Sequence, residues 1–191
     1  MRRGVFPAIP MLVATVVACG GSDSSPAAPA QTPPSQPSGT FTLTSPVGAD
    51  GGTLPAEHTC DGTGVSPALS WLNGPSGTRE FALMMTTLPG DGTTKWNWVL
   101  YGIPASTTGL AKNSSGVGTL GVGSDGPQAA YQPPCSQGPG AKLYIFTLYA
   151  LSATPSLPVP ANQVTGAVLT GAIANITLGS ASLRLSYARP Q

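Results

Sequence analysis

The chain contains few of the side chains that carry catalytic chemistry. Its 191 residues include one histidine, His58, and three cysteines, and only 8% of them are charged. A Ser-His-Asp or Cys-His mechanism would have to use His58, which we expect on the surface. One histidine and two cysteines cannot complete a four-ligand zinc site. We therefore expect no enzymatic activity, no metal and no cofactor.

Positive charge is also sparse. Beyond Arg2 and Arg3, six Lys and Arg residues remain against seven acidic residues, and they are scattered singly along the chain: Arg79, Lys95, Lys112, Lys142, Arg184 and Arg189. Proteins that bind nucleic acid gather such residues into a patch or stripe. We expect no nucleic-acid partner.

No apolar run is long enough to span a membrane. The run from Val5 to Val17 follows two arginines and covers about 13 residues, whereas a transmembrane helix needs about 20. It ends in Val16-Val17-Ala18-Cys19, a pattern typical of a bacterial lipoprotein signal. We predict that residues 1–18 are a signal peptide and that Cys19 becomes the acylated N-terminus; the alternative is an ordinary signal peptide with a chance cysteine.

The predicted lipid anchor on Cys19 also indicates where the protein is located. Lipid on Cys19 would hold the protein in a membrane of the bacterial cell envelope. Gly20 and Gly21 follow the cysteine with no Asp at the second position, which by analogy with Gram-negative lipoproteins favours the outer membrane. The remaining two cysteines, Cys60 and Cys135, are an even pair in an exported protein and predict one disulfide.

Composition divides the mature chain into two parts. Residues 19–39 are almost entirely Gly, Ser, Pro, Ala, Gln and Thr, with one charge. Such a segment buries too little apolar surface to fold, so we predict a disordered tether. Residues 40–191 are long enough for a single domain with its own core.

Alternation of apolar and polar residues dominates the domain. It predicts half-buried strands at 41–44 and 183–187, and longer apolar runs predict central strands, buried on both faces, at 80–85, 96–103 and 143–151. Strand spacing places Trp96 and Trp98 on one face. A single helix is expected at 163–173. The prediction is a mainly β protein, an antiparallel β-sandwich with one or two short helices.

Six segments of the domain together resemble one protein family. They are Thr59-Cys60-Asp61-Gly62, Ser66 to Trp71, Gly77 to Leu83, Trp96 to Ala105, Pro134-Cys135 and Tyr144 to Leu151. In this order they resemble the phosphatidylethanolamine-binding protein family, in its bacterial Raf-kinase-inhibitor-like branch. The resemblance implies a sandwich of that type with an anion pocket at one end, which accepts phosphate-type head groups.

The segments that form this pocket in the family are altered here. The family's acidic loop is replaced by Thr86 to Asp91, its first histidine by Asn97, and its His-Arg-Tyr triplet by Lys142-Leu143-Tyr144. An amide and a lysine could still hold an anion. The candidate ligand-binding residues are Thr87, Asp91, Asn97, Trp98, Tyr131, Pro134, Lys142 and Tyr144.

Two functions of different classes follow. In the first, the domain binds a small anion or a phospholipid head group in a modified pocket, without catalysis. In the second, the pocket is vestigial and the domain acts on a protein partner, for instance as an inhibitor. The two differ in whether Asn97, Trp98, Lys142 and Tyr144 converge on a cavity.

Overall fold

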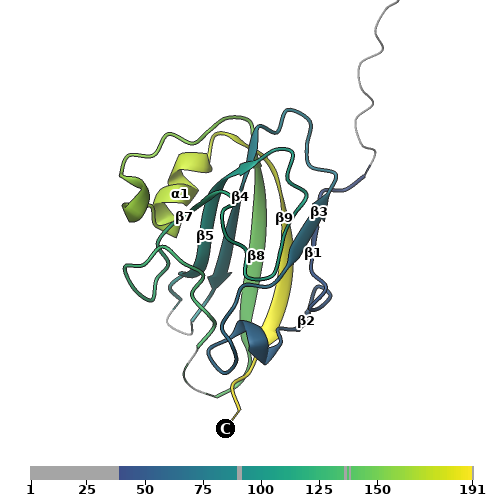
Figure 1. Cartoon of the computed structure of the whole chain (residues 1–191), viewed down its shortest axis with the longest axis vertical. Coiled ribbons are helices and arrows are strands. Elements are labelled where there is room, and N and C mark those ends of the chain that lie inside the picture. The colour runs from purple at the N-terminus through teal and green to yellow at the C-terminus, as the bar shows by residue number, and fades with distance from the viewer. Residues whose placement is uncertain (1–38, 90–91, 136, 138, 191) are drawn as a thin grey trace, which may run out of the picture. The chain divides into compact units, whose positions relative to one another are not determined.

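The computed structural model describes residues 39–89, 92–135, 137 and 139–190 (Figure 1). The predicted signal peptide, Cys19, the tether up to residue 38 and Asp91 therefore lie outside the described residues. Within them, no helix is both long and apolar enough to cross a membrane.

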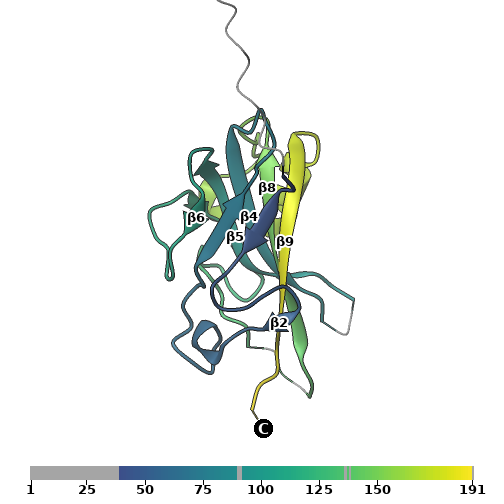
Figure 2. The same cartoon turned by 90° about the vertical axis from the view of Figure 1, so that its right-hand side faces the viewer.

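Two β-sheets and one α-helix make up the domain (Figures 1 and 2). The larger sheet has six strands in the order β2 (Gly52–Thr53), β9 (Thr177–Tyr187), β8 (Lys142–Leu151), β4 (Glu80–Thr87), β5 (Lys95–Pro104) and β7 (Thr119–Leu120). The smaller sheet has three, in the order β1 (Thr42–Thr44), β3 (Leu69–Leu72) and β6 (Gly109–Leu110). The helices are α1 (Gly166–Ile173) and the 3₁₀ turns η1 (Ala56–His58) and η2 (Ala161–Gln163).

Each face of the large sheet has its own hydrophobic core. Residues of β4 alternate between them, so that Leu83 packs toward the small sheet and Met84 toward α1. The first core lies between the two sheets, where Trp71 of β3 meets Phe81 edge to face. The second core is closed by Leu169 and the other buried residues of α1. Helix, large sheet and small sheet thus form three layers.

The structure confirms the mainly β class and the predicted strands and helix, with three corrections. The large sheet is not wholly antiparallel, because β2 runs parallel to β9, with Gly52 opposite Leu185. These two strands are far apart in the chain, so no tight hairpin dictates their relative direction. The expectation that β8 is buried on both faces was also wrong: Leu143 is 46% exposed, because α1 does not cover that end of the sheet.

The two tryptophans of β5 lie on opposite faces of the sheet, which corrects the prediction of one shared face. Met85 of β4 pairs with Trp98, but the next residue, Thr86, pairs with Trp96, so Asn97 is an extra residue in β5. Such a β-bulge shifts the alternation by one position. Trp98 therefore enters the core between the sheets, whereas Trp96 packs on the helix side.

The start of α1 is fitted closely to Trp96. Thr165 caps the helix by accepting a hydrogen bond from the Val168 N–H. The first helical residue, Gly166, lies so close to the Trp96 indole that a Cβ atom there would overlap the ring. The second glycine of the helix, Gly171, has open space around the position of its missing Cβ. Only the first glycine is therefore required by packing.

The two glycines give opposite expectations for alanine. Gly166→Ala should lower the free energy of unfolding by about 1–3 kcal/mol, because the added methyl must displace a packed indole. Gly171→Ala should raise it by about 0.5–1 kcal/mol, because alanine loses less backbone entropy in a helix. Urea unfolding of both variants checks this. Equal effects of the two substitutions would show that Trp96 does not constrain the helix start.

Candidate functional site

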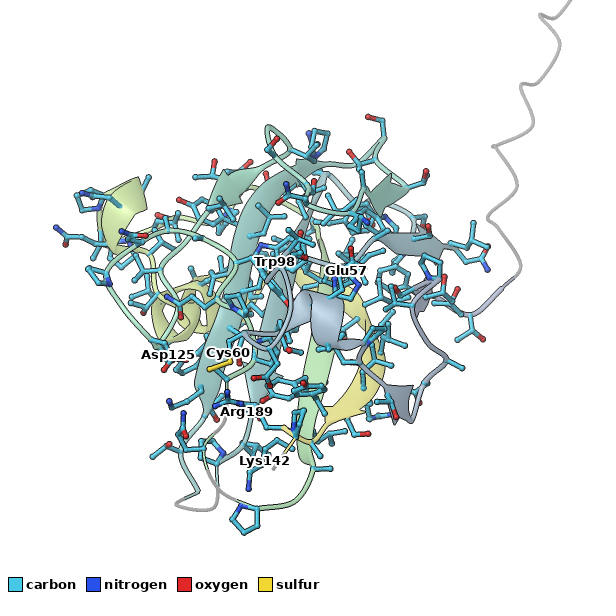
Figure 3. The ribbon with its side chains drawn as sticks, turned by 60° about the horizontal axis from the view of Figure 1, so that its bottom comes forward. Glu57, Cys60, Trp98, Asp125, Lys142 and Arg189 are labelled. Carbon is cyan, nitrogen blue, oxygen red and sulfur yellow. A yellow bond between two sulfur atoms is a disulfide. The ribbon has the colours of Figure 1, made fainter. Side chains whose placement is uncertain are left out.

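A cavity of about 830 Å³ opens at the end of the domain where β4 ends and β5 and β8 begin. Strand ends, the segment 125–135 and the Cys60–Cys135 disulfide surround it. Figure 3 looks toward this end and shows Cys60, Asp125 and Lys142. The cavity is lined by Cys60, Thr87, Pro89, Lys95, Asn97, Asp125, Gly126, Pro127, Gln128, Ala130, Tyr131, Gln132, Pro133, Cys135, Gln137, Lys142 and Tyr144.

Strand pairing brings the strand residues of the site together. Thr87 at the end of β4 pairs with Lys95 on one side and with Tyr144 on the other. Lys142 precedes Tyr144 by two residues and therefore lies on the same face of β8. Thr87 itself donates a hydrogen bond to the Leu143 carbonyl at 2.8 Å, which ties the ends of β4 and β8 together.

The segment 125–135 forms one wall and is attached to the turn η1 and the residues after it. Cys60 and Cys135 are disulfide-bonded, as predicted, and the Cys60 N–H donates to the Pro134 carbonyl at 3.0 Å. Tyr131 donates its hydroxyl to the His58 carbonyl at 2.7 Å. Burial raises the pKa of Tyr131 well above its usual value, so the hydroxyl remains a donor throughout the physiological range.

The same wall is attached to β5 through Asn97 and Gln132. The Asn97 amide nitrogen donates to the Gln132 carbonyl, and the Gln132 N–H donates to the Asn97 carbonyl at 2.7 Å. The Gln132 side chain then accepts the Asp125 N–H at 2.8 Å. One N–H of the Asn97 amide, the donor that the sequence suggested for an anion, is thus used inside the protein. Asn97 shapes the cavity floor and holds its wall.

Charge is divided between two sides of the cavity. On the β5 side, Lys95 Nζ lies 2.8 Å from Asp125 Oδ1, and both side chains are about half exposed. On the β8 side, Lys142 is half-buried and makes no ion pair with any residue in the described part of the chain. Of the two lysines that line the cavity, Lys142 is therefore the one without an ion pair to a described residue.

Most of the predicted site residues converge. Both bridge cysteines line the cavity, together with Thr87, Asn97, Tyr131, Lys142 and Tyr144. Two predicted residues do not line it. Trp98 is 1% exposed and lies beneath Tyr131, with the two rings edge to face at 5.4 Å. Pro134 is buried behind the wall and contributes only its carbonyl to Cys60.

The surface position expected for His58 was wrong. The side chain is fully buried, and its Nδ1 lies 2.8 Å from the Val65 carbonyl, so this nitrogen carries the proton and donates it. The imidazole thereby ties η1 to the segment before β3. His58 is buried because the segment 59–65 folds back over it. Such a loop has no periodic sequence pattern, so the burial could not be predicted.

Several residues of the cavity were not selected from the sequence, among them Lys95, Asp125 and Gln128. Lys95 begins β5, whereas Asp125 and Gln128 belong to the wall segment 125–135. Asp125 stands in a Gly- and Ser-rich stretch and suggested only a turn. Its partner Lys95 is 30 residues away, and no motif links the two positions.

The fold and the sequence together establish the family. Residues 44–188 match the family model described as phosphatidylethanolamine-binding protein. The chain belongs to the phosphatidylethanolamine-binding protein family, as the sequence resemblance predicted.

Individual relatives agree with this assignment. The chain is 32% identical over 185 residues to the Mycobacterium tuberculosis protein named "Putative lipoprotein LppC", covering 90% of each chain. It is 34% identical over 119 residues to a UPF0098 protein of Methanothermobacter thermautotrophicus, covering 60% of this chain and 78% of that one. The crystal structure of Escherichia coli YbcL has the same fold, with a TM-score of 0.70 at 24% identity, covering 78% of this chain and 99% of that chain.

The disulfide should contribute measurably to stability. Replacing both Cys60 and Cys135 by serine removes a link that closes a separation of 75 residues, and we expect the free energy of unfolding to fall by about 2–4 kcal/mol. Denaturant unfolding with and without reductant measures this. Reductant should lower the stability of the native chain to that of the double variant and leave the variant unchanged. A native chain insensitive to complete reduction would contradict the expectation.

Proposed function

We propose that this protein is a non-catalytic lipoprotein of the bacterial cell envelope whose phosphatidylethanolamine-binding-like domain binds a small anion. The bound group would be a phosphate or carboxylate, free or as part of a larger molecule such as a phospholipid head group. It would lie against Lys142 in the cavity at the end of the large sheet.

The observation that carries the proposal is the half-buried position of Lys142 at the cavity, where it forms no ion pair with any residue that the structure describes. Arg184, Arg189, Lys112 and Lys95 each form an ion pair with an aspartate or glutamate within the described residues, whereas Lys142 faces a cavity without one. A lysine in this position attracts an anion as a compact point charge. Partial burial reduces the screening of that charge by solvent.

Two observations support the envelope location. The segment before the domain has the order of a lipoprotein signal, with Arg2 and Arg3, an apolar run and then Cys19. A relative that covers 90% of this chain bears the name of a lipoprotein. We propose that acylated Cys19 anchors the protein, and that the residues after it favour the outer membrane.

Removal of the Lys142 charge tests the anion site. Lys142→Met should weaken the binding of inorganic phosphate or acetate at least tenfold, measured by calorimetry on the full chain in detergent, because the variant keeps the apolar stem and loses the ammonium. The matched control is Arg79→Met, which removes another cation with no ion pair in the described part of the chain but outside the cavity.

The outcomes separate the two functional classes. Equal weakening by both variants would mean that general charge, and not the cavity, attracts the anion. Absence of binding by the native chain would overturn the proposal.

The alternative is an interaction module. Leu88 is 61% exposed and Leu143 is 46% exposed. They flank Thr87 and Tyr144, which are paired across β4 and β8. Both leucines lie at the end of the sheet that α1 does not cover. A chain that binds no anion, but loses a partner on Leu88→Ser with Leu143→Ser, would have this function instead.

A further inference from the structure

The cavity is much larger than the anion that Lys142 could hold. Its volume is about 830 Å³, whereas one water molecule in the liquid occupies about 30 Å³ and a phosphate ion is only a few times larger. Cavities of about 300–1,000 Å³ enclose organic ligands. The size of the cavity therefore indicates that the ligand is an organic molecule with an anionic group.

The lining indicates which kind of body fits. Among the described residues, no Leu, Ile, Val, Met or Phe side chain lines the cavity. The apolar surface that an acyl chain would meet consists of tyrosine rings, prolines, one alanine and the disulfide. The polar side chains between them are amides, two lysines, one aspartate and one threonine. Such a lining favours a polar ligand that forms several hydrogen bonds and packs one of its faces on a tyrosine ring.

The Lys95–Asp125 pair has a polarity that hydroxyl groups complement. Lys95 Nζ and Asp125 Oδ1 are 2.8 Å apart and about half exposed at the cavity. A hydroxyl both donates and accepts, so one hydroxyl can donate to the carboxylate while its oxygen accepts from the ammonium. A second anionic group at this position would instead meet the negative charge of Asp125. This side of the cavity suits hydroxyls, and the Lys142 side suits the anion.

The spacing of the two sides matches a single sugar ring with its anionic substituent. Lys95 and Tyr144 pair with Thr87 from opposite sides, and strands lie about 4.8 Å apart, so β5 and β8 are about 10 Å apart. Lys142 is two residues further along β8. Gln128 from the wall also lines the cavity and offers an amide with both a donor and an acceptor.

We propose that the ligand is an anionic carbohydrate, a sugar bearing a phosphate or carboxylate. Its anion lies against Lys142, and its hydroxyls are bound by the Lys95–Asp125 pair and Gln128. This inference rests on the proposed function for the anionic end and adds the class of molecule that fills the remainder of the cavity.

Calorimetry on the full chain in detergent tests the proposal with five probes: glucose 6-phosphate, glucuronate, inorganic phosphate, glucose and phosphoethanolamine. We expect glucose 6-phosphate or glucuronate to bind at least tenfold more tightly than inorganic phosphate and than glucose. The first two probes distinguish a phosphate from a carboxylate as the anionic group.

Asp125→Ala gives a readout that a folding defect cannot imitate. The substitution removes hydroxyl recognition and one negative charge from the cavity, so it should weaken glucose 6-phosphate at least fivefold while strengthening inorganic phosphate. A misfolded variant would lose both. Gln128→Ala, an exposed residue of the wall, should weaken only the sugar and leave inorganic phosphate unchanged.

Failure of this inference differs from failure of the proposed function. Equal affinity for inorganic phosphate and both anionic sugars would overturn the carbohydrate and leave the anion site intact. Tighter binding of phosphoethanolamine would overturn it in favour of a head group. Absence of heat with all five probes would overturn both.

Discussion

The two-sided pairing of β4 is the constraint on which the rest of the domain depends. All eight of its residues pair with β8, and β5 covers its other edge over nearly the same length. Both edges of β4 are hydrogen-bonded and both of its faces are covered. Its side chains point alternately into two separate hydrophobic cores. This explains why Glu80 to Thr87 is almost continuously buried. It also explains why the helix and the small sheet can pack independently on its two faces.

The cavity lies beyond the last residue of β4. There β8 continues for two residues past the one paired with Thr87, whereas β5 begins opposite Thr87, and the wall segment 125–135 closes the space from one side. The bulge at Asn97 completes the arrangement, since it turns Trp98 into the core and leaves Asn97 to bind Gln132. The extra residue Asn97 thus has two effects: it directs the Trp98 indole into the core beneath the site, and it binds the wall of the cavity.

The features that could be predicted from the sequence are those with local causes. Alternation revealed the strands because side chains in a strand repeat every two residues, and Lys142 was found because it replaces a residue in a short motif. The bulge was missed because nothing in Trp96-Asn97-Trp98 marks Asn97 as an extra residue. The burial of His58 and the Lys95–Asp125 pair were missed for a related reason. Each depends on segments that meet only when the sheet is complete.

The Cys60–Cys135 bridge sets an order of events during biogenesis. The partner of Cys60 lies 75 residues further along the chain, so the bond can form only after that residue has been synthesised. Both thiols remain reduced in the cytosol, where disulfides rarely persist. A precursor on its way to the envelope would therefore have its cavity wall held only by hydrogen bonds. The cavity wall would therefore be closed covalently only after export.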